Sequence, residues 1–288
     1  MIIVKIMGGL GNQLFTYAFA YALAKERNTQ VILDKQIYQT NYLLRKCNLD
    51  SFTIRYSKEL IPFSLGHRKL ANKIYNRLHD FYLKIMYHPE IICEEEQFGI
   101  QHIEINQKNL YLKGYWQNYR YFHQYRNDLI NEFSLKNPSD HIKFIVDKAS
   151  KEMPIAMHVR RGDYKTFKGG KCLSMSYYRD ALAYLKKECG YKNPIWIFTD
   201  DVDFCRKIFG EEKNIFYIAQ IEGISDEEEF YIMTKCTHYI IANSTFSWWA
   251  AYLSEAKEKK VVAPVVDMWN KDFYLPNWKT IKAEIEVE

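Results

Sequence analysis

The fold of this chain is decided by the stretch Ile155 to Tyr164, which has the sequence IAMHVRRGDY. Its first half has the composition of a short buried strand, and that strand ends at two adjacent arginines followed by a glycine. Ligands of open α/β sheets bind just beyond the carboxyl ends of the strands. Paired guanidinium groups at such a position present rigid forks of donors that suit a phosphate. The stretch therefore predicts an anion clamp made by Arg160 and Arg161.

The sequence that follows alternates strands and helices at a regular spacing. Strands are expected at 155–159, 195–198, 215–218, 239–242 and 261–263, and helices at 177–189, 203–209, 226–236 and 245–257. Ser225 and Glu228 have the spacing of a capping box at the third of these helices. This alternation predicts a parallel sheet covered by helices on both faces.

The start of the chain predicts a second unit of the same kind. Ile2 to Ile6 has the pattern of a buried strand, and a glycine loop follows it. The segment from Gln13 to about Arg27 is apolar on nearly every side, as in a buried helix, and Val31 to Leu33 predicts the next strand. Glycines before a helix let backbone N–H groups approach a ligand closely, so this βαβ unit also predicts a binding loop.

The middle of the chain is less regular. One helix is expected from about Arg68 to Met86, as an insertion facing a substrate or the other domain, and the apolar residues of one face are Leu70, Ile74, Leu78, Phe81 and Ile85. The polar stretch from Phe133 to Met153 predicts a domain boundary, which gives an N-terminal domain of residues 1–150 and a C-terminal domain of residues 151–288.

Composition limits the class of protein. The chain of 288 residues is 48% hydrophobic and 26% charged, as in a soluble globular protein, and its net charge of +5 is too mild to predict a nucleic-acid partner. No apolar run approaches the roughly 18 residues of a membrane helix, and the N-terminus lacks the pattern of a secretory signal. We therefore expect a cytoplasmic protein. The six cysteines lie far apart without metal-ligand spacing, which predicts free thiols.

Three strand ends in the second half carry polar residues. They are the segments 158–163 (HVRRGD), 199–201 (TDD) and 243–247 (NSTFS). Parallel strands bring their carboxyl ends to one edge, so these loops are expected to converge on one crevice. The last segment opens a helix with the free N–H groups and short hydroxyls that suit a phosphate, although plain N-capping by Asn243 or Ser244 is the alternative. His158 is either a ligand contact or a buried core histidine.

Two other patterns favour different chemistry. Gly9 and Gly11, followed by Asp34 at the end of the next strand, favour a dinucleotide site, but Leu14 stands where the third glycine belongs, and a tight turn is the alternative. Asp201 and Asp203 form a D-x-D pattern that can hold a divalent metal, or they cap the next helix. With arginines available to neutralise a diphosphate, we expect no metal.

Four separated motifs together resemble the α-1,2-fucosyltransferases of glycosyltransferase family 11, of the bacterial type. They are 8–15 (GGLGNQLF), 158–164 (HVRRGDY), 198–201 (FTDD) and 243–249 (NSTFSWW). The resemblance implies an α/β fold of GT-B type, with two Rossmann-like domains whose parallel sheets face each other across a cleft. The N-terminal domain would lie on the acceptor side, the C-terminal domain would bind GDP-fucose, and the last residues would pack back on the N-terminal domain.

The implied activity is inverting transfer of L-fucose from GDP-fucose to the 2-hydroxyl of a terminal galactose in a glycan. It needs no obligatory metal and no other cofactor, and it would serve surface polysaccharide or O-antigen synthesis. The implied partners are GDP-fucose, a galactose-terminated acceptor and, by peripheral contact, the inner membrane where lipid-linked glycans are built. The alternatives are a non-catalytic module that binds a nucleotide sugar or a glycan, a transferase for a different GDP-sugar, and a dinucleotide oxidoreductase.

The resemblance also implies residue roles. Arg160 resembles the arginine that neutralises the donor diphosphate, and it is the expected catalytic residue. Asp163, the nearest carboxylate in sequence, is either the general base or a partner that orients Arg160 or Arg161. The residues expected to bind the donor are Gly9, Gly11, Asn12, Gln13, His158, Arg161, Asp200, Asp201, Asn243, Ser244, Thr245 and Ser247.

Overall fold

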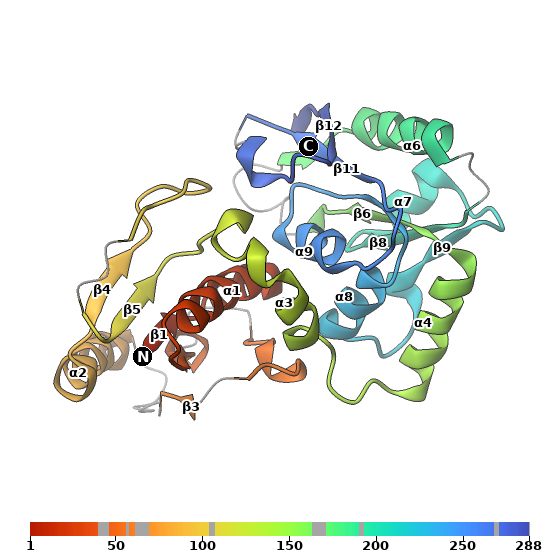
Figure 1. Cartoon of the computed structure of the whole chain (residues 1–288). Coiled ribbons are helices and arrows are strands. Elements are labelled where there is room, and N and C mark those ends of the chain that lie inside the picture. Colours follow the sequence, from red (N-terminus) through yellow and green to blue (C-terminus); the bar gives the residue numbers. More distant parts are fainter. Residues whose placement is uncertain are drawn as a thin grey trace. The chain divides into compact units, whose positions relative to one another are not determined.

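The computed structural model describes residues 1–39, 46–55, 58–60, 69–103, 107–162, 171–189, 193–267 and 271–287. The chain divides into two compact units, Met1–Ser134 and Leu135–Glu288. Each unit is built around a parallel sheet of its own (Figure 1). The prediction of an α/β protein with two parallel sheets is confirmed.

The sheet of the first unit has the strand order β3-β2-β1-β5-β4, with all described neighbours parallel. Its strands are β1 (Ile2–Lys5), β2 (Val31–Asp34), β3 (Lys58–Glu59), β4 (Glu90–Cys93) and β5 (Leu110–Lys113). Its helices are α1 (Leu10–Glu26), α2 (Lys69–Tyr87) and α3 (Arg126–Glu132). The predicted buried helix is α1, whose apolar and small residues are buried on nearly all sides. Phe19 of α1, for example, stacks on the fully buried Trp116 with ring centroids 4.4 Å apart.

The sheet of the second unit has the strand order β12-β11-β10-β6-β8-β9, and its described neighbours are again parallel. Its strands are β6 (Ile155–Val159), β8 (Ile195–Thr199), β9 (Ile215–Tyr217), β10 (His238–Ile240), β11 (Val261–Val265) and β12 (Lys279–Lys282). The chain runs outward from β6 through β8 to β9, then returns to the other side of β6 at β10. This is the strand order of the Rossmann fold, in which the ligand crevice lies where the order reverses. Here that point lies between the carboxyl ends of β6 and β10.

The helices of the second unit are α4 (Asp140–Glu152), α6 (Met175–Cys189), α7 (Val202–Phe209), α8 (Asp226–Thr234) and α9 (Thr245–Leu253). The predicted capping box is confirmed, because Ser225 and Glu228 each accept a hydrogen bond from the other's backbone N–H. The polar stretch expected at the domain boundary contains α4, which is capped by Ser139. Two strands outside the main sheet, β7 (Lys171–Leu173) and β13 (Ile285–Val287), pair antiparallel.

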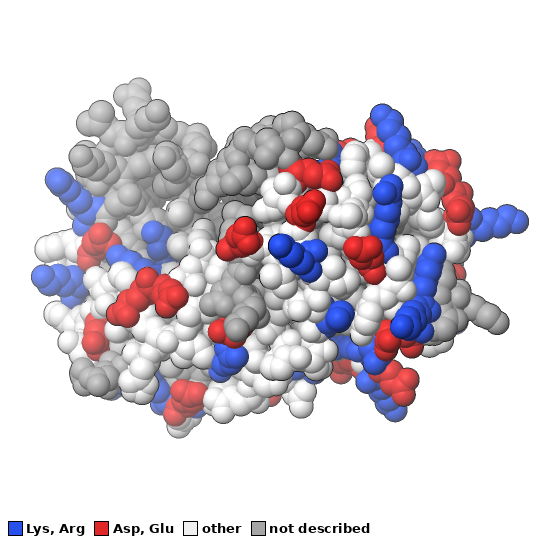
Figure 2. Space-filling model, turned by 90° about the horizontal axis from the view of Figure 1, so that it is seen from above, with Lys and Arg blue, Asp and Glu red and all other residues white. Residues whose placement is uncertain are grey.

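Surface charge and helix length are the two features of the structure that concern nucleic-acid and membrane partners. On the face shown in Figure 2, Lys and Arg side chains are interspersed with Asp and Glu side chains. No helix in the described segments combines the length and the apolar composition needed to cross a membrane.

Candidate active site

Arg160 and Asp200 form an ion pair at the carboxyl ends of β6 and β8. The distance from Arg160 Nη1 to Asp200 Oδ2 is 2.9 Å, and the two side chains keep 30% and 25% of their surface exposed. The other oxygen of Asp200 accepts a hydrogen bond from the backbone N–H of Arg161 at 2.8 Å. Asp200 therefore holds the end of β6 and orients the Arg160 guanidinium, which stays accessible to an anion.

Arg161 points into the protein. Its side chain is 3% exposed, its Nε lies 3.2 Å from Asp201 Oδ2, and its guanidinium carbon lies 3.3 Å from the centre of the Phe204 ring. Asp201 also caps α7 by accepting a hydrogen bond from the Phe204 N–H. The described pairs thus join the two arginines to Asp200 and Asp201, whereas the expected partner Asp163 lies outside the described residues.

Gly162 is required by close approach of Asp200. A Cβ atom at this position would lie 2.9 Å from Asp200 Oδ2, the oxygen that pairs with Arg160. A side chain here would push the carboxylate out of the ion pair. The glycine that follows the two arginines is therefore explained by packing against Asp200.

His158 is buried beside Arg160. It is 5% exposed, and its ring centre lies 5.7 Å from that of Phe246, the second residue of α9. Burial and then the charge of Arg160 lower the pKa of His158 to about 3, so the imidazole is neutral near pH 7. Its Nδ1 has no hydrogen-bond partner in the described part of the chain. Contact of His158 with the donor stays a prediction, but a protonated imidazole is not available for it.

The start of α9 presents hydroxyl groups near His158. Ser244 is the N-cap, and its Oγ accepts a hydrogen bond from the Phe246 N–H at 3.3 Å. Ser244 and Thr245 are partly exposed, whereas Asn243 and Ser247 are buried. Ser247 donates its hydroxyl to the Ser244 carbonyl at 3.4 Å. The geometry therefore favours Ser244 and Thr245 over the two buried residues as contacts for a phosphate.

The glycine loop lies at the carboxyl end of β1 in the first unit. Gly8 has φ +78°, and a Cβ there would lie 2.7 Å from Asn12 Nδ2. Gly9 is the N-cap of α1, and Asn12 accepts a hydrogen bond from Gln117, which follows β5, at 2.8 Å. Gly11 is buried within α1. Asn12 and Gly9 thus lie at the edge of the sheet where strand order reverses between β1 and β5.

Gln13 is fully buried and braces this loop. Its Nε2 donates to the carbonyl groups of Gly8 and Lys46 at 3.1 and 3.0 Å, and its Oε1 accepts from the Asn48 N–H at 2.8 Å. These three hydrogen bonds use most of the donors and acceptors of the side-chain amide group. The side chain of Gln13 holds the loop in place, and its direct contact with a donor stays a prediction.

The carboxylate of Asp34 interacts with other side chains of the protein, which argues against a dinucleotide site. It is 2% exposed, and its Oδ2 accepts from the Tyr111 hydroxyl at 2.5 Å and lies 3.5 Å from His79 Nε2. Although burial alone would raise the pKa of Asp34, bonding to His79 and Tyr111 lowers it below its usual range. A carboxylate held in this way is not free to bind a ribose.

The two acids of the D-x-D pattern have different surroundings in the described residues. Asp201 is used by Arg161 and α7, and the side chain of Asp203 is 89% exposed and 4.0 Å from Arg206. Within those residues, no group of three or more His, Cys, Asp or Glu side chains is placed to hold a metal ion. The capping alternative explains Asp201.

Glu229 is a titratable group, within electrostatic reach of Arg160, that the sequence did not single out. It lies in the first turn of α8, next to Phe230, whose ring centre is 5.3 Å from that of Phe246. Burial and the charges of Asp226 and Asp200 raise the pKa of Glu229 to about 7, against the lowering effect of Arg160. The sequence predicted only the capping box of Ser225 and Glu228 here, because helical spacing alone does not show which acidic side chain interacts with Arg160.

Replacement of Glu229 by glutamine is expected to stabilise the protein in a pH-dependent way. Because the folded pKa is raised above 4.5, the free energy of unfolding of the wild type falls as pH rises from about 4.5 to about 7 and then levels off. Glutamine cannot ionise, so the stability advantage of E229Q over the wild type should be about 2 kcal/mol larger at pH 8 than at pH 5. Urea unfolding at both pH values measures this. An equal difference at the two values would contradict the raised pKa.

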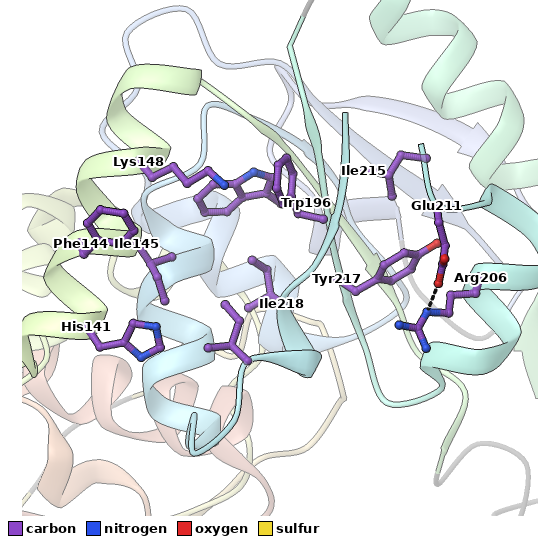
Figure 3. A pocket seen from close by; sticks show the side chains of 12 residues that line it. His141, Phe144, Ile145, Lys148, Trp196, Arg206, Glu211, Ile215, Tyr217 and Ile218 are labelled. Carbon is purple, nitrogen blue, oxygen red and sulfur yellow. Dashed lines mark ion pairs between the residues drawn. The ribbon is translucent and has the colours of Figure 1, made fainter. Parts of the chain in front are cut away.

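A separate cavity of about 590 Å³ lies around the edge strand β9. Figure 3 shows Phe144, Ile145 and Lys148 of α4 near Trp196 on one side and the ion pair between Arg206 and Glu211 on the other. None of the residues that line it is a predicted site residue. The predicted site residues of the second unit that the structure describes lie instead at the carboxyl ends of β6, β8 and β10.

Comparisons with known proteins agree with this geometry. Residues 1–282 match the family model described as Glycosyl transferase family 11. The chain is 30% identical to an Escherichia coli alpha-1,2-colitosyltransferase over 284 residues, 92% of this chain and 91% of that one. It is 25% identical to galactoside alpha-(1,2)-fucosyltransferase 2 of Hylobates lar over 306 residues, 98% of this chain and 79% of that one.

The fold has solved counterparts. The structure of E. coli ADP-heptose lps heptosyltransferase II superposes with a TM-score of 0.52 at 11% identity, covering 97% of this chain and 89% of that one. This similarity supports the GT-B fold. The family match over nearly the whole chain, together with the Arg160 and Asp200 pair at the switch point of a Rossmann sheet, leads to one conclusion: the chain belongs to glycosyltransferase family 11.

Proposed function

We propose that this protein transfers L-fucose from GDP-fucose to the 2-hydroxyl of a terminal galactose, with inversion at the anomeric carbon. The observation that carries the proposal is Arg160, a partly exposed guanidinium oriented by Asp200 where strand order reverses. The N-terminal start of α9 supports it, since partly exposed Ser244 and Thr245 add hydroxyl groups and a positive helix end. The names of the two relatives supply the linkage and the galactoside acceptor.

The proposed reaction is a single displacement. The acceptor hydroxyl attacks the anomeric carbon, the bond from that carbon to the phosphate oxygen breaks, and GDP leaves with the electron pair. Negative charge grows on the β-phosphate in the transition state, so a fixed cation placed there stabilises the transition state more than the ground state. Arg160 has that role. The proton of the hydroxyl passes to a base, for which Asp163 remains the candidate from the sequence.

The donor sugar is the point on which the two relatives differ. Colitose is fucose without the 3-hydroxyl, so the choice depends on whether the site hydrogen-bonds that hydroxyl. A site built to do so rejects the analogue that lacks it by a factor of about 10⁴, because its polar groups are left unpaired. A donor site for fucose is therefore expected to use GDP-fucose far better than GDP-colitose.

The test gives the purified protein equal amounts of GDP-fucose and GDP-colitose together with galactosides, and reads product mass and linkage. Fucose joined α-1,2 to galactose is the expected product. Colitose transfer in preference to fucose would make the protein a transferase for a different GDP-sugar. Binding of GDP without transfer or donor hydrolysis would make it a non-catalytic module, and binding of NAD(P) in place of GDP would make it a dinucleotide enzyme.

Sugar transfer is expected to survive EDTA. In the proposed mechanism Arg160 and the start of α9 neutralise the diphosphate, and the carboxylate of Asp201, a candidate metal ligand, is already paired with Arg161. Initial rates with and without EDTA should agree within about twofold, well below the ~10²-fold loss that follows removal of a transition-state donor. Complete loss of activity that manganese restores would favour the D-x-D pattern as a metal site instead.

A further inference from the structure

The cavity around β9 lies within the second unit and takes no part in the proposed sugar transfer. Its volume of about 590 Å³ falls in the range of about 300–1,000 Å³ that is typical of small-molecule sites. We call it the β9 cavity. The lining residues that concern a ligand are Phe144, Lys148, Trp196, Arg206, Glu211 and Phe216. Aromatic and paired charged side chains together make this cavity a candidate for a second binding site.

One side of the β9 cavity is aromatic. Phe144 of α4 is 68% exposed, so its ring presents a bare face. Trp196 of β8 is buried, and its ring centre lies 6.4 Å from that of Phe216 on β9. Figure 3 shows Phe144 and Trp196 on the same side of the cavity. The C–H groups on one face of a sugar ring are apolar and weakly positive, and they match the negative face of an aromatic ring.

Trp196 also brings a hydrogen-bond donor to the β9 cavity. Its Nε1 is buried and has no hydrogen-bond partner among the residues that the structure describes. The same is true of Trp116 and Trp278, but neither of these lines the cavity. Most buried polar side-chain atoms in native proteins have a partner, either in the protein or in a bound molecule such as water. An oxygen atom of a ligand in the cavity would give Trp196 such a partner.

The charged side chains of the β9 cavity are paired within the protein. Arg206 Nε lies 2.7 Å from Glu211 Oε1. Lys148 Nζ lies 3.8 Å from Glu152 Oε1 and 3.8 Å from the centre of the Phe216 ring. A phosphate would have to compete with these carboxylates for the two cations. The pairing therefore favours a neutral ligand over an anion.

A neutral ligand in this cavity still has to satisfy polar groups. A guanidinium has five N–H donors and a carboxylate has about four acceptor positions, so the pair of Arg206 and Glu211 offers donors and acceptors together. A purely apolar ligand would cover the pair without hydrogen bonds, which costs free energy. A hydroxyl group both donates and accepts. A saccharide combines many hydroxyl groups with an apolar ring face, so it matches the polar pair and the aromatic side alike.

We propose that the β9 cavity is a second carbohydrate site. It binds a neutral oligosaccharide with one sugar ring on Phe144 and with hydroxyl groups on Lys148 and on the pair of Arg206 and Glu211. The chain belongs to a glycosyltransferase family, so saccharides are among its reactants. The source of the oligosaccharide rests on the proposed function, in which it is either the galactose-terminated acceptor or the fucosylated product. Binding itself does not depend on transfer.

The indole N–H signals in the NMR spectrum of isotope-labelled protein test the proposal. The chain has six tryptophans, and the signal of Trp196 is the one that Trp196→Phe removes. The protein is titrated with lactose, which represents the acceptor, and with lactose that carries α-1,2-linked fucose, which represents the product. The Trp196 signal is expected to move and to saturate, and the sugar that binds more tightly identifies the source. The signal of Trp278, which precedes β12 at the opposite edge of the sheet, should stay in place.

Phe144→Ala is expected to weaken saccharide binding about tenfold, because the sugar no longer buries an aromatic ring. Titration calorimetry measures this affinity without any signal assignment. The exposed position of Phe144 lets the variant fold. Phe81→Ala is the matched control, since Phe81 is 62% exposed on α2 in the first unit and does not line the cavity. It should bind the sugars as the wild type does.

Arg160→Ala separates this proposal from the proposed function. It is expected to lose transfer and to keep the saturable movement of the Trp196 signal. Transfer by a wild type whose Trp196 signal does not respond to sugars would reject the second site alone. A response of Trp196 in a wild type that transfers no fucose would reject the proposed function alone.

Three results would overturn the proposal. One is a Trp196 signal that neither sugar moves. Another is Phe144→Ala that binds the sugars as tightly as Phe81→Ala. The third is a Trp196 signal that moves with inorganic phosphate and with neither sugar, which would make the β9 cavity an anion site.

Discussion

Replacement of Arg160 by alanine is expected to lower the rate of sugar transfer by about 10² to 10³ while leaving the protein folded. The guanidinium is the partly exposed cation oriented by Asp200, so its loss removes charge stabilisation from the leaving diphosphate. The effect should fall on kcat more than on KM, because the charge on the β-phosphate grows in the transition state. Initial rates over a range of GDP-fucose concentrations measure both constants.

Arg160→Lys serves as the control for this change. It keeps a positive charge but loses the fork of donors, so it should recover only part of the rate. The thermal unfolding temperature of both variants should stay close to that of the wild type, since an ion pair at the surface contributes little to stability. Near-normal turnover by Arg160→Ala would refute the anion clamp.

Replacement of Arg161 by alanine is expected to act on stability instead. The side chain is 3% exposed, pairs with Asp201 and packs on the ring of Phe204. Removing one partner of a buried ion pair leaves the other charge without compensation, and typically costs about 3 kcal/mol. Urea unfolding measures the free energy.

Arg206→Ala is the matched control for Arg161→Ala, because Arg206 also belongs to an ion pair on α7. Its side chain is 38% exposed and lies 2.7 Å from Glu211. Loss of an exposed pair of this kind should cost less than about 1 kcal/mol. If Arg161→Ala instead kept wild-type stability and lost GDP affinity, Arg161 would be a ligand contact and not a support.

The fold could be predicted from the sequence where local patterns and burial agree. In the second unit, β6, β8 and β9 form with helices between them as expected, because each strand is a short apolar run closed by polar residues. The edge strand β12 was missed. β12 has the sequence KTIK and is mostly exposed, so it has no apolar run to reveal it. Its pairing with β11 is made by backbone groups, which leave no trace in the side-chain pattern.

The sequence predicts which loops form the candidate site, but it does not predict which arginine pairs with which carboxylate. Convergence of the segments after β6 and β8 follows from parallel strands, and the ion pair of Arg160 with Asp200 confirms that they meet. Which carboxylate each arginine takes depends on side-chain packing between residues about 40 positions apart. Burial of Gln13 could not be predicted either, because its hydrogen bonds to Lys46 and Asn48 join distant parts of the sequence and form only in the folded chain.

The orientation of α2 could not be predicted from periodicity alone. The spacing of Leu78, Phe81 and Ile85 correctly indicates one face of a helix, but a helix with apolar residues on two sides must choose which to bury. The described residues that α2 buries are His79, which lies 3.5 Å from Asp34 on β2, and Leu83 and Tyr87, which pack against the sheet.

The central place of β6 in its sheet has a consequence for motion. β6 is hydrogen-bonded on one side to β8 and on the other to β10, and all five of its residues are buried. Strands in this position exchange their amide hydrogens only when a whole domain opens, whereas edge strands such as β9 and β12 fray locally. Arg160 follows directly from β6. We therefore expect the backbone of Arg160 to keep its place as long as the second unit stays folded. The guanidinium proposed to meet the diphosphate is thus expected to follow one of the slowest-exchanging strands of the unit.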